Sequence, residues 1–409
     1  MSQKTFEINS CEVCGNKDLI PVLNLGLHPM CDDLVEVNST RICKEYPIEI
    51  VFCTNCITAH QKFQIPKDEL FPKTYHYRSR FTADVLNGMK SLVAETEKMF
   101  GSLSGKRVVD IGCNDGSLLG FFREKGAITI GIEPTGAAAD AQEKGHAVYN
   151  KFLSVDVAKQ IVQEHGTADF ISFTNVFAHI ENLGEVVSAL KCLLSPNTVI
   201  VIENHYLGSV LDRNQFDTFY HEHPRTYSFT SFVHIARSLG SEIKHVEFPS
   251  RYGGNIRVFI GQSVKASGFD VKEIEEREKG YQGRFEKMSN GIGKWIDHKK
   301  KEIDSHIQKS GKLKAKAFPG RSAILVKLLG LNENHISAVY EKPGSMKIDH
   351  YVPGTRIPIK SDDDLFKSEK LNEPILNFAW HISAEIKNYL KSNGYTGEVI
   401  DILSNEDFQ

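Results

Sequence analysis

The sequence has no long apolar run and almost no net charge. No stretch of about 18 apolar residues occurs that could span a bilayer as a helix. The first residues, MSQKTFEINS, lack the charged and then apolar pattern of a targeting peptide. The 49 Lys and Arg residues nearly balance 52 Asp and Glu, so the basic excess that a nucleic-acid backbone attracts is missing. We expect a cytoplasmic protein with neither a membrane nor a nucleic acid as partner.

Internal repeats and low-complexity segments are also missing, so the 409 residues predict two or three domains of ordinary size. Residues 1–72 are irregular and need a cross-link for stability. Over residues 73–250 strand-like and helix-like runs alternate, as in KRVVDIGCNDGSLLGFF and TVIVIEN, which is typical of a mostly parallel sheet. A charged helical stretch of mixed sign follows, and the alternation then returns. We expect an α/β protein: a small N-terminal zinc-binding module, a central Rossmann-like domain and a C-terminal α/β domain over residues 251–409.

Cysteine is scarce outside the first module, because six of the eight cysteines lie within residues 11–56. Four of them form two CxxC pairs, and each pair can hold one side of a tetrahedral zinc ion. Four thiolates leave no open coordination position, so the zinc is expected to be structural. Unligated surface thiols, or replacement of one ligand by Cys31 or Cys43, are the alternatives. The expected ligands are Cys11, Cys14, Cys53 and Cys56.

The segment VVDIGCNDGSLL combines a strand, a sharp turn and the start of a helix. Gly112 and Gly116 let the backbone approach a ligand closely. Roughly 20 residues later a second strand ends at Glu133, which can accept hydrogen bonds from the ribose hydroxyls of an adenosine. Asp115 would repel a pyrophosphate but suits the positive groups of S-adenosylmethionine. The turn therefore favours methyl transfer over redox chemistry, whose sites prefer GxGxxG. The cofactor candidates are Asp110, Gly112, Asn114, Asp115, Gly116, Glu133 and Asn175.

Residues 216–229, FDTFYHEHPRTYSF, place four acid–base groups in a row from Tyr220 to His223. In the functional interpretation His223 or Tyr220 moves a proton while Glu222 orients or tunes the base. His179 follows a predicted strand, on the edge where such sheets bind ligands. A surface turn for HEH and a purely structural role for His179 are the alternatives.

Further motifs occur in order along the chain: TYHYRS near residue 77, NVFAHI, RYGGNIRVF, YVPGTRIPI and FAWHISAEI. Together with the CxxC pairs, VVDIGCNDGSLL, GIEP and FYHEH, they resemble the three-domain sugar C-methyltransferases, which act on nucleotide-linked keto-deoxysugars. The resemblance covers nearly the whole chain. It implies S-adenosylmethionine as methyl donor, a structural zinc ion, and a nucleotide-linked sugar held chiefly between the central and C-terminal domains.

The resemblance also implies a mechanism, in which a proton beside the sugar ketone is removed and the enolate attacks the sulfonium methyl. A ketone makes the neighbouring C–H acidic enough for a side-chain base. By motif, Tyr220, Glu222 and His223 are similar to the family's acid–base group. His179 is similar to its enolate stabiliser, and Tyr77 to a tyrosine near the methyl group. The implied substrate contacts are Tyr252, Asn255, Arg257, Arg321 and Arg356.

The chain departs from the family pattern at several points. Pro224-Arg225-Thr226 follow HEH, AFPGRSAIL replaces a Gly-Ala-Pro-led motif, and His381 stands where asparagine is more usual. The altered segment after HEH keeps methylation of oxygen or nitrogen on a related sugar as an alternative. A silent zinc-binding scaffold is a third interpretation, although a scaffold has no need of clustered polar groups.

Overall fold

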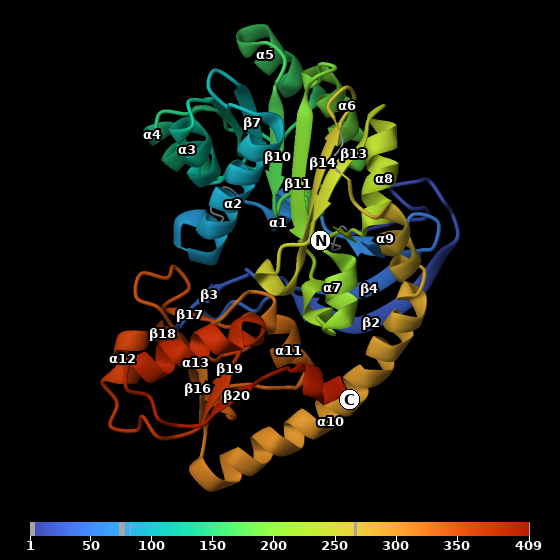
Figure 1. Cartoon of the computed structure of the whole chain (residues 1–409). Helices are drawn as coiled ribbons and strands as arrows, with labels where there is room; N and C mark the ends of the chain where they lie inside the picture. The colour runs from blue at the N-terminus through green and yellow to red at the C-terminus, as the bar shows by residue number, and fades with distance from the viewer. Residues whose placement is uncertain (1–4, 73–77, 82, 266–267, 409) are drawn as a thin grey trace.

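The computed structural model describes residues 5–72, 78–81, 83–265 and 268–408. Figure 1 shows the central sheet in the upper part of the molecule and the C-terminal domain below it, with the N-terminal strands behind. The expected α/β class with three units is confirmed. Among the helices of the described residues, none combines the length and the apolar character that crossing a membrane requires.

The N-terminal module is built on a four-stranded antiparallel sheet, ordered β12-β5-β4-β2. Burial alternates along β4, so one face of the sheet packs inward. The edge strand β12 is contributed by the central domain and pairs Arg225 with His60. The segment after HEH therefore belongs to the sheet of the zinc module. The strands are β2 (Leu19–Pro29), β4 (Glu45–Cys53), β5 (Thr58–Gln61) and β12 (Arg225–Thr226), and the short pairs are β1 (Phe6–Glu7) with β6 (Phe63–Gln64) and β3 (Val35–Glu36) with β17 (His350–Tyr351).

The central domain holds a seven-stranded sheet, ordered β13-β14-β11-β10-β7-β8-β9. Its first five strands in the chain are parallel, and β14 is antiparallel to both neighbours. The inner strands are buried on both faces because helices cover them. The strands are β7 (Arg107–Ile111), β8 (Ile128–Ile132), β9 (Ala147–Tyr149), β10 (Phe170–Thr174), β11 (Val199–His205), β13 (Glu242–Glu247) and β14 (Asn255–Gly261). The helices are α2 (Ala83–Phe100), α3 (Ser117–Glu124), α4 (Ala137–Glu143), α5 (Val155–His165), α6 (Leu183–Leu193), α7 (Leu207–Asp212) and α8 (Phe229–Ser238).

The central sheet extends past residue 250, where we expected the domain to end. Strand β14 completes the sheet by pairing with β11 over six residues, from Ile200↔Ile260 to His205↔Asn255. The hairpin from β13 to β14 needs both strands in one sheet. The motif RYGGNIRVF thus lies in the central domain.

Helix α10 (Tyr281–Ser310) runs down one side of the molecule and reaches all three units (Figure 1). A single stripe of buried residues, from Tyr281 to Ile303, follows helical spacing, and the remaining faces are polar. Phe285 packs against Phe52 of the zinc module. Trp295 packs against Phe216 and donates a hydrogen bond to the carbonyl of Ile402 at 3.1 Å. The shorter α9 (Val271–Glu278) precedes it.

The C-terminal domain is a five-stranded parallel sheet, ordered β18-β16-β15-β19-β20. The run SAILVKL forms the buried helix α11. The strands are β15 (Leu313–Lys316), β16 (Ile336–Glu341), β18 (Ile359–Ser361), β19 (Ile375–Asn377) and β20 (Val399–Asp401). The helices are α11 (Ser322–Leu328), α12 (Asp362–Phe366) and α13 (Ser383–Ser392).

Candidate active site and metal centre

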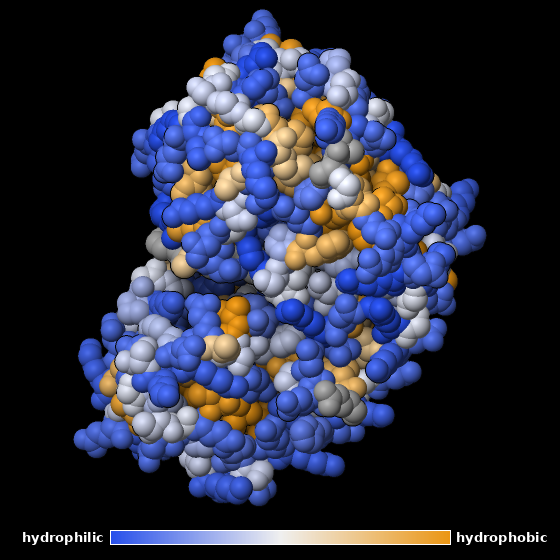
Figure 2. Space-filling view, viewed as in Figure 1, coloured by the Kyte–Doolittle hydropathy of each residue, from blue (hydrophilic) through white to orange (hydrophobic). Residues whose placement is uncertain are grey.

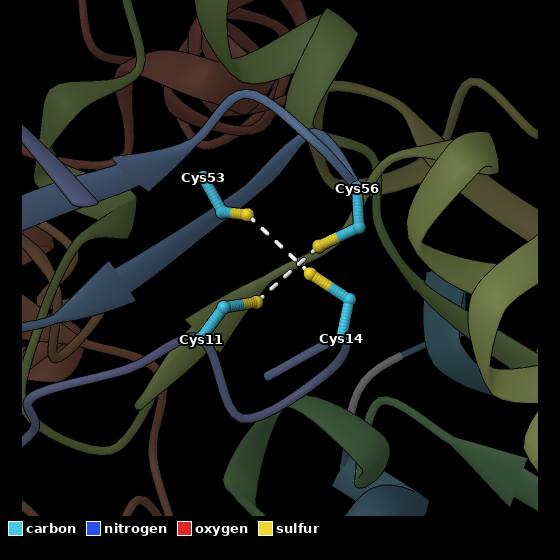
Figure 3. Close-up of side chains that lie close together, drawn as sticks. All are labelled: Cys11, Cys14, Cys53 and Cys56. Atoms are coloured by element: carbon cyan, nitrogen blue, oxygen red, sulfur yellow. Dashed lines mark hydrogen bonds between the residues drawn. The ribbon is translucent and has the colours of Figure 1, made fainter. Parts of the chain in front are cut away.

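The two CxxC pairs converge on one point, as Figure 3 shows. Their four sulfur atoms all lie within 4.8 Å of one another. Cys11 Sγ is 3.3 Å from Cys56 Sγ, and Cys14 Sγ is 3.6 Å from Cys53 Sγ. Four sulfurs at about 2.3 Å from a tetrahedral zinc ion would be about 3.8 Å apart. The cysteines therefore fit a four-thiolate zinc site after shifts of a few tenths of an ångström.

Donors around the sulfurs also suit thiolates. Thr58 Oγ1 lies 3.0 Å from Cys56 Sγ, and Asn55 Nδ2 donates to Cys14 Sγ at 3.3 Å. Without a cation the crowded thiols cannot all ionise, and contact with Cys53 raises the pKa of Cys11 to about 12. A divalent cation removes this conflict, because metal ligation favours the thiolate. Cys31 and Cys43 lie outside the cluster: Cys31 lines a cavity and Cys43 donates to a backbone carbonyl.

A buried polar chain joins the metal centre to the reactive segment. His60 Nε2 lies 3.3 Å from Cys11 Sγ, and its other nitrogen faces the carboxylate of Glu12 at 3.7 Å. Glu12 accepts a hydrogen bond from Arg225 Nη1 at 2.5 Å, and Arg225 is fully buried. Removing either partner of such a pair would leave a buried charge uncompensated. Arg225, an unexplained departure in the sequence, therefore fastens the segment after HEH to the zinc module.

A cavity of about 660 Å³ opens between the central and C-terminal domains, where Figure 2 shows the surface hollowed. Its size is that of a site for a small molecule or cofactor. All three units contribute to its wall: Asp32 comes from the first, Glu133 from the second and Lys316 from the third. The carboxyl ends of β7, β8, β10 and β11 all lead into it.

Glycine and asparagine form the cofactor end of this cavity. Gly112 has a φ of 70°, and a Cβ there would lie 2.6 Å from a methyl group of Val176. Asn114 and Asn175 also have positive φ, which asparagine tolerates best among side chains other than glycine. Glu133 accepts hydrogen bonds from the backbone N–H of Asn114 at 3.0 Å and of Thr135 at 2.9 Å. The turn is thus built around the Glu133 carboxylate.

Asp110 lies beneath this turn and is buried. Its Oδ1 accepts a hydrogen bond from Ser172 Oγ at 2.7 Å. Burial raises the pKa of Asp110 to about 7. The side chain lines the cavity and can present either a carboxyl or a carboxylate near neutral pH.

Asp115 and Gly116 do not face the cavity. The Asp115 carboxylate accepts hydrogen bonds from Ser117 Oγ at 2.6 Å and from the backbone N–H of Arg80 at 3.0 Å. The expectation that Asp115 meets the positive groups of the methyl donor is therefore wrong, because these bonds hold it at the start of α3. Gly116 instead allows close packing, since a Cβ there would lie 2.9 Å from that of Ala141.

The reactive cluster is gathered from three segments of the cavity wall. The ring centroid of His223 lies 4.8 Å from that of His179, 5.5 Å from that of His205 and 4.2 Å from that of Tyr220. All four side chains line the cavity, as does Glu222. His221 turns away, and its Nε2 bonds to the carbonyl of Tyr46 at 3.1 Å. The HEH segment is therefore buried, which rules out the surface-turn interpretation.

Backbone carbonyls fix the orientation of two histidines. His223 Nδ1 donates to the carbonyl of Thr218 at 3.0 Å, and His179 Nδ1 donates to the carbonyl of Glu222 at 2.7 Å. In the neutral ring each Nε2 then carries a lone pair. Burial, with His179 and His205 nearby, lowers the pKa of His223 well below 6.5. Burial likewise raises the pKa of Tyr220 well above 10.0, so the phenol keeps its proton.

Of the expected substrate residues, Arg321 lines the cavity and three others do not. Arg257 is buried in β14, with Nε 2.7 Å from a Glu203 oxygen and Nη1 2.8 Å from a Glu247 oxygen. Asn255 donates to Glu203 at 3.0 Å. Arg356 donates to the carbonyls of Ser39 and Arg41, which ties the C-terminal domain to the zinc module. Substrate contact by these three is therefore not supported.

Two expected residues cannot be placed: Tyr77 lies outside the described residues, and so does the side chain of Tyr252. Sequence reasoning also missed cavity-lining residues. His205 ends β11 at the same sheet edge as His179, a signal that could have identified it. In the C-terminal domain Lys316 ends β15 and His381 follows β19, and both line the cavity.

Comparison with known families accounts for the three units in turn. Residues 11–71 match the family described as "Putative zinc binding domain", residues 81–246 match "Methyltransferase domain", and residues 250–400 match "C-methyltransferase C-terminal domain". In order and content the three matches resemble a three-domain C-methyltransferase, and two of them carry methyltransferase descriptions, so the chain is a methyltransferase. The four clustered cysteines of this methyltransferase lie in the unit that matches the zinc-binding family.

Relatives of this methyltransferase differ in how much of the chain they match. The C-methyltransferase NovU of Streptomyces niveus is 26% identical over 95% of this chain and 94% of its own. A ubiquinone biosynthesis O-methyltransferase of Rhodopseudomonas palustris is 32% identical, but over only 26% of this chain and 42% of its own. The solved magnesium protoporphyrin IX methyltransferase of Synechocystis, with bound S-adenosylmethionine, covers 44% of this chain and 80% of its own at 17% identity and a TM-score of 0.33.

Proposed function

We propose that this methyltransferase transfers a methyl group to the carbon beside the ketone of a nucleotide-linked deoxysugar. The observation that carries the proposal is the cavity itself, whose wall contains a neutral histidine with an available lone pair together with the cofactor turn and residues of the C-terminal domain. The likeness to a C-methyltransferase over nearly the full length supports carbon as the acceptor.

His223 is the base in this proposal. Because its Nδ1 is bound to the carbonyl of Thr218, its Nε2 accepts the proton from the substrate carbon. The depressed pKa makes His223 a weak base in the free protein. Negative charge that develops on the substrate oxygen would stabilise the imidazolium and offset part of that weakness.

Tyr220 is a hydrogen-bond donor in this proposal, because the phenol keeps its proton and its ring lies beside that of His223. His179 is less suited than expected to stabilise an enolate. Its Nδ1 proton is committed to Glu222, so a neutral His179 offers a lone pair and not a donor. We assign His179 and Glu222 to holding the reactive segment in place.

The bound cofactor supplies an electrophilic methyl group on a sulfonium. Gly112 and Asn114 would allow it to approach the backbone, and Glu133 would accept hydrogen bonds from its ribose. Lys342 and Lys347 line the cavity and would attract the diphosphate of the nucleotide-linked sugar, whereas Arg321 and Lys316 are paired with Asp217 and Asp362.

The test is solvent exchange at carbon. The purified protein is incubated in D2O with S-adenosylhomocysteine and thymidine, uridine, guanosine or cytidine diphosphate-linked 4-keto-6-deoxyhexoses, and the sugar is analysed by NMR. We expect deuterium at the carbon beside the ketone, and a methyl group there when S-adenosylmethionine is supplied. The matching 4-hydroxy sugars are the control and should not exchange.

Methyl transfer to oxygen or nitrogen without deuterium at carbon would replace the proposal by the alternative chemistry. Methyl transfer to none of these sugars, together with absence of exchange, would contradict the proposed substrate class.

A further inference from the structure

His381 is a cavity-lining histidine from the C-terminal domain that the proposed mechanism does not yet use. It lies in the short turn η5 (Trp380–Ile382), between β19 and α13. Its Nδ1 is buried and has no hydrogen-bond partner in the described part of the chain. Burying a polar atom without a hydrogen-bond partner costs folding free energy. Such an atom in the wall of a binding cavity therefore indicates that the ring has a role in binding a ligand.

The neighbouring turn is held firmly in place. Trp380 Nε1 donates to Asp217 Oδ2 at 2.9 Å, and Asp217 is fully buried in the segment that leads to the HEH motif. Arg321 binds the same carboxylate through Nε at 2.8 Å and Nη2 at 2.6 Å. The rings of Trp380 and His381 meet edge to face at 6.4 Å between centroids. His381 is therefore attached to the reactive segment through a network, not through a flexible loop.

The hydrogen bonds of His381 contrast with those of His179 and His223. Each of those two has its ring proton committed to a backbone carbonyl, so its other nitrogen can only accept. His381 has no such carbonyl in the described part of the chain. A proton on its enclosed Nδ1 would be a buried donor without an acceptor, which favours the tautomer with the proton on Nε2. His381 can thus donate into the cavity.

The charge state agrees with this role. Burial, and then the positive charge of Arg321 and the nearby His205, lower the pKa of His381 well below 6.5. The ring is neutral at physiological pH and keeps its Nε2 proton as the pH rises. A neutral donor does not compete with His223 for the substrate proton.

We infer that His381 donates a hydrogen bond from Nε2 to the carbonyl oxygen of the acceptor, which becomes the enolate oxygen. The inference rests on the proposed function. As His223 Nε2 takes the proton, the C–H electron pair forms the carbon–carbon double bond and the carbonyl π pair moves to oxygen. Donors aimed at that oxygen lower the barrier because its negative charge grows in the transition state. Tyr220 and His381 would form a two-donor oxyanion site from different domains.

The experiment compares His381→Leu, His381→Gln and His381→Asn with the wild type. Gln can place an N–H near the position of Nε2, whereas Asn places one near Nδ1. The readouts are the deuterium exchange described above, kcat and KM for methyl transfer, and S-adenosylhomocysteine binding as a check of folding. His298→Leu is the control, because His298 is 70% exposed on α10 outside the cavity.

We expect His381→Leu to lower both the exchange rate and kcat by about 10²-fold, the usual effect of losing one oxyanion donor. KM and cofactor binding should change little. His381→Gln should recover most of the loss and His381→Asn less. Equal losses in Leu and Gln would overturn the inference, because a merely structural role would not distinguish them.

The wild type separates this inference from the proposed function. Absence of exchange by the wild type would overturn the proposed function and with it the role of His381. Exchange by the wild type that His381→Leu leaves intact would overturn the role of His381 alone.

Discussion

The zinc cluster and the histidine-lined cavity both gather chemically active side chains, but in opposite ways. At the cluster four sulfurs lie within 4.8 Å of one another, and only a shared cation can balance the charge of four thiolates. In the cavity His179 and His223 are anchored from behind by backbone carbonyls and leave their other nitrogens for a ligand. The first arrangement therefore contributes to folding stability when the cation binds, whereas the second leaves ring nitrogens available for chemistry on a ligand.

The largest expected effect concerns the metal centre. Cys53→Ser should release zinc and destabilise the protein by several kcal/mol, since structural zinc contributes folding energy directly. Zinc content and thermal unfolding are the measurements. Cys192→Ser is the control, because that thiol lies on α6 and bonds to a backbone carbonyl away from the cluster. Native zinc content in Cys53→Ser would contradict the assignment of Cys53 as a zinc ligand.

The next effect concerns the base. His223→Asn should lower solvent exchange and methyl transfer by about 10²- to 10⁴-fold, the range for general-base catalysis, and leave cofactor binding intact. His221→Asn tests the same turn outside the cavity, since His221 bonds to the zinc module. If the two variants lose equal activity, the turn acts as a structural unit and His223 is not the base.

A pH effect distinguishes the cofactor end of the cavity. Folding raises the pKa of Asp110 from 3.8 to about 7, so the folded protein keeps a proton that the unfolded chain releases. The stability from this carboxyl is complete below about pH 4 and is lost as the pH rises through 7. Asp110→Asn should therefore gain up to about 4 kcal/mol relative to the wild type between about pH 4 and 8. The measurement is unfolding of the variant and the wild type without ligand at about pH 4 and about pH 8. A stability difference between the two proteins that is the same at both pH values would contradict this assignment.

A smaller effect is expected for cofactor affinity. Glu133→Gln keeps the shape of the side chain but removes the negative charge that would accept from the ribose, so S-adenosylhomocysteine should bind about tenfold more weakly. Calorimetric titration measures it. Glu124→Gln, exposed at the end of α3, is the control and should bind normally. Unchanged affinity in Glu133→Gln would move the ribose site elsewhere.

The smallest effect concerns Arg356, which lies outside the cavity. Arg356→Ala should cost less than about 1 kcal/mol, because its two hydrogen bonds to carbonyls are partly exposed. The KM for a nucleotide-linked sugar should be unchanged. A large rise in KM would restore the substrate role that its sequence motif implied.

The three units and the mostly parallel central sheet were largely predictable, because burial patterns repeat with the period of each element. The predicted limit at residue 250 matches the break between the two family matches, but β14 beyond it pairs with β11, and pairing between distant strands leaves no local signal. Gly112 and Glu133 were found for local reasons, as a turn and a strand end. Asp115 was misassigned because its partners, Ser117 and the backbone of Arg80, decide which way the carboxylate points.

By itself the sequence determined the composition of each site: two CxxC pairs, a glycine turn with an acidic strand end, and the run YHEH. Spacing is enough for these, because their chemistry lies within a few residues. Only the tertiary structure decided that His205 and His381 join that run, that Arg225 turns to the zinc module, and that Arg257 is sealed in ion pairs. Such assignments depend on contacts between buried side chains that lie far apart along the chain.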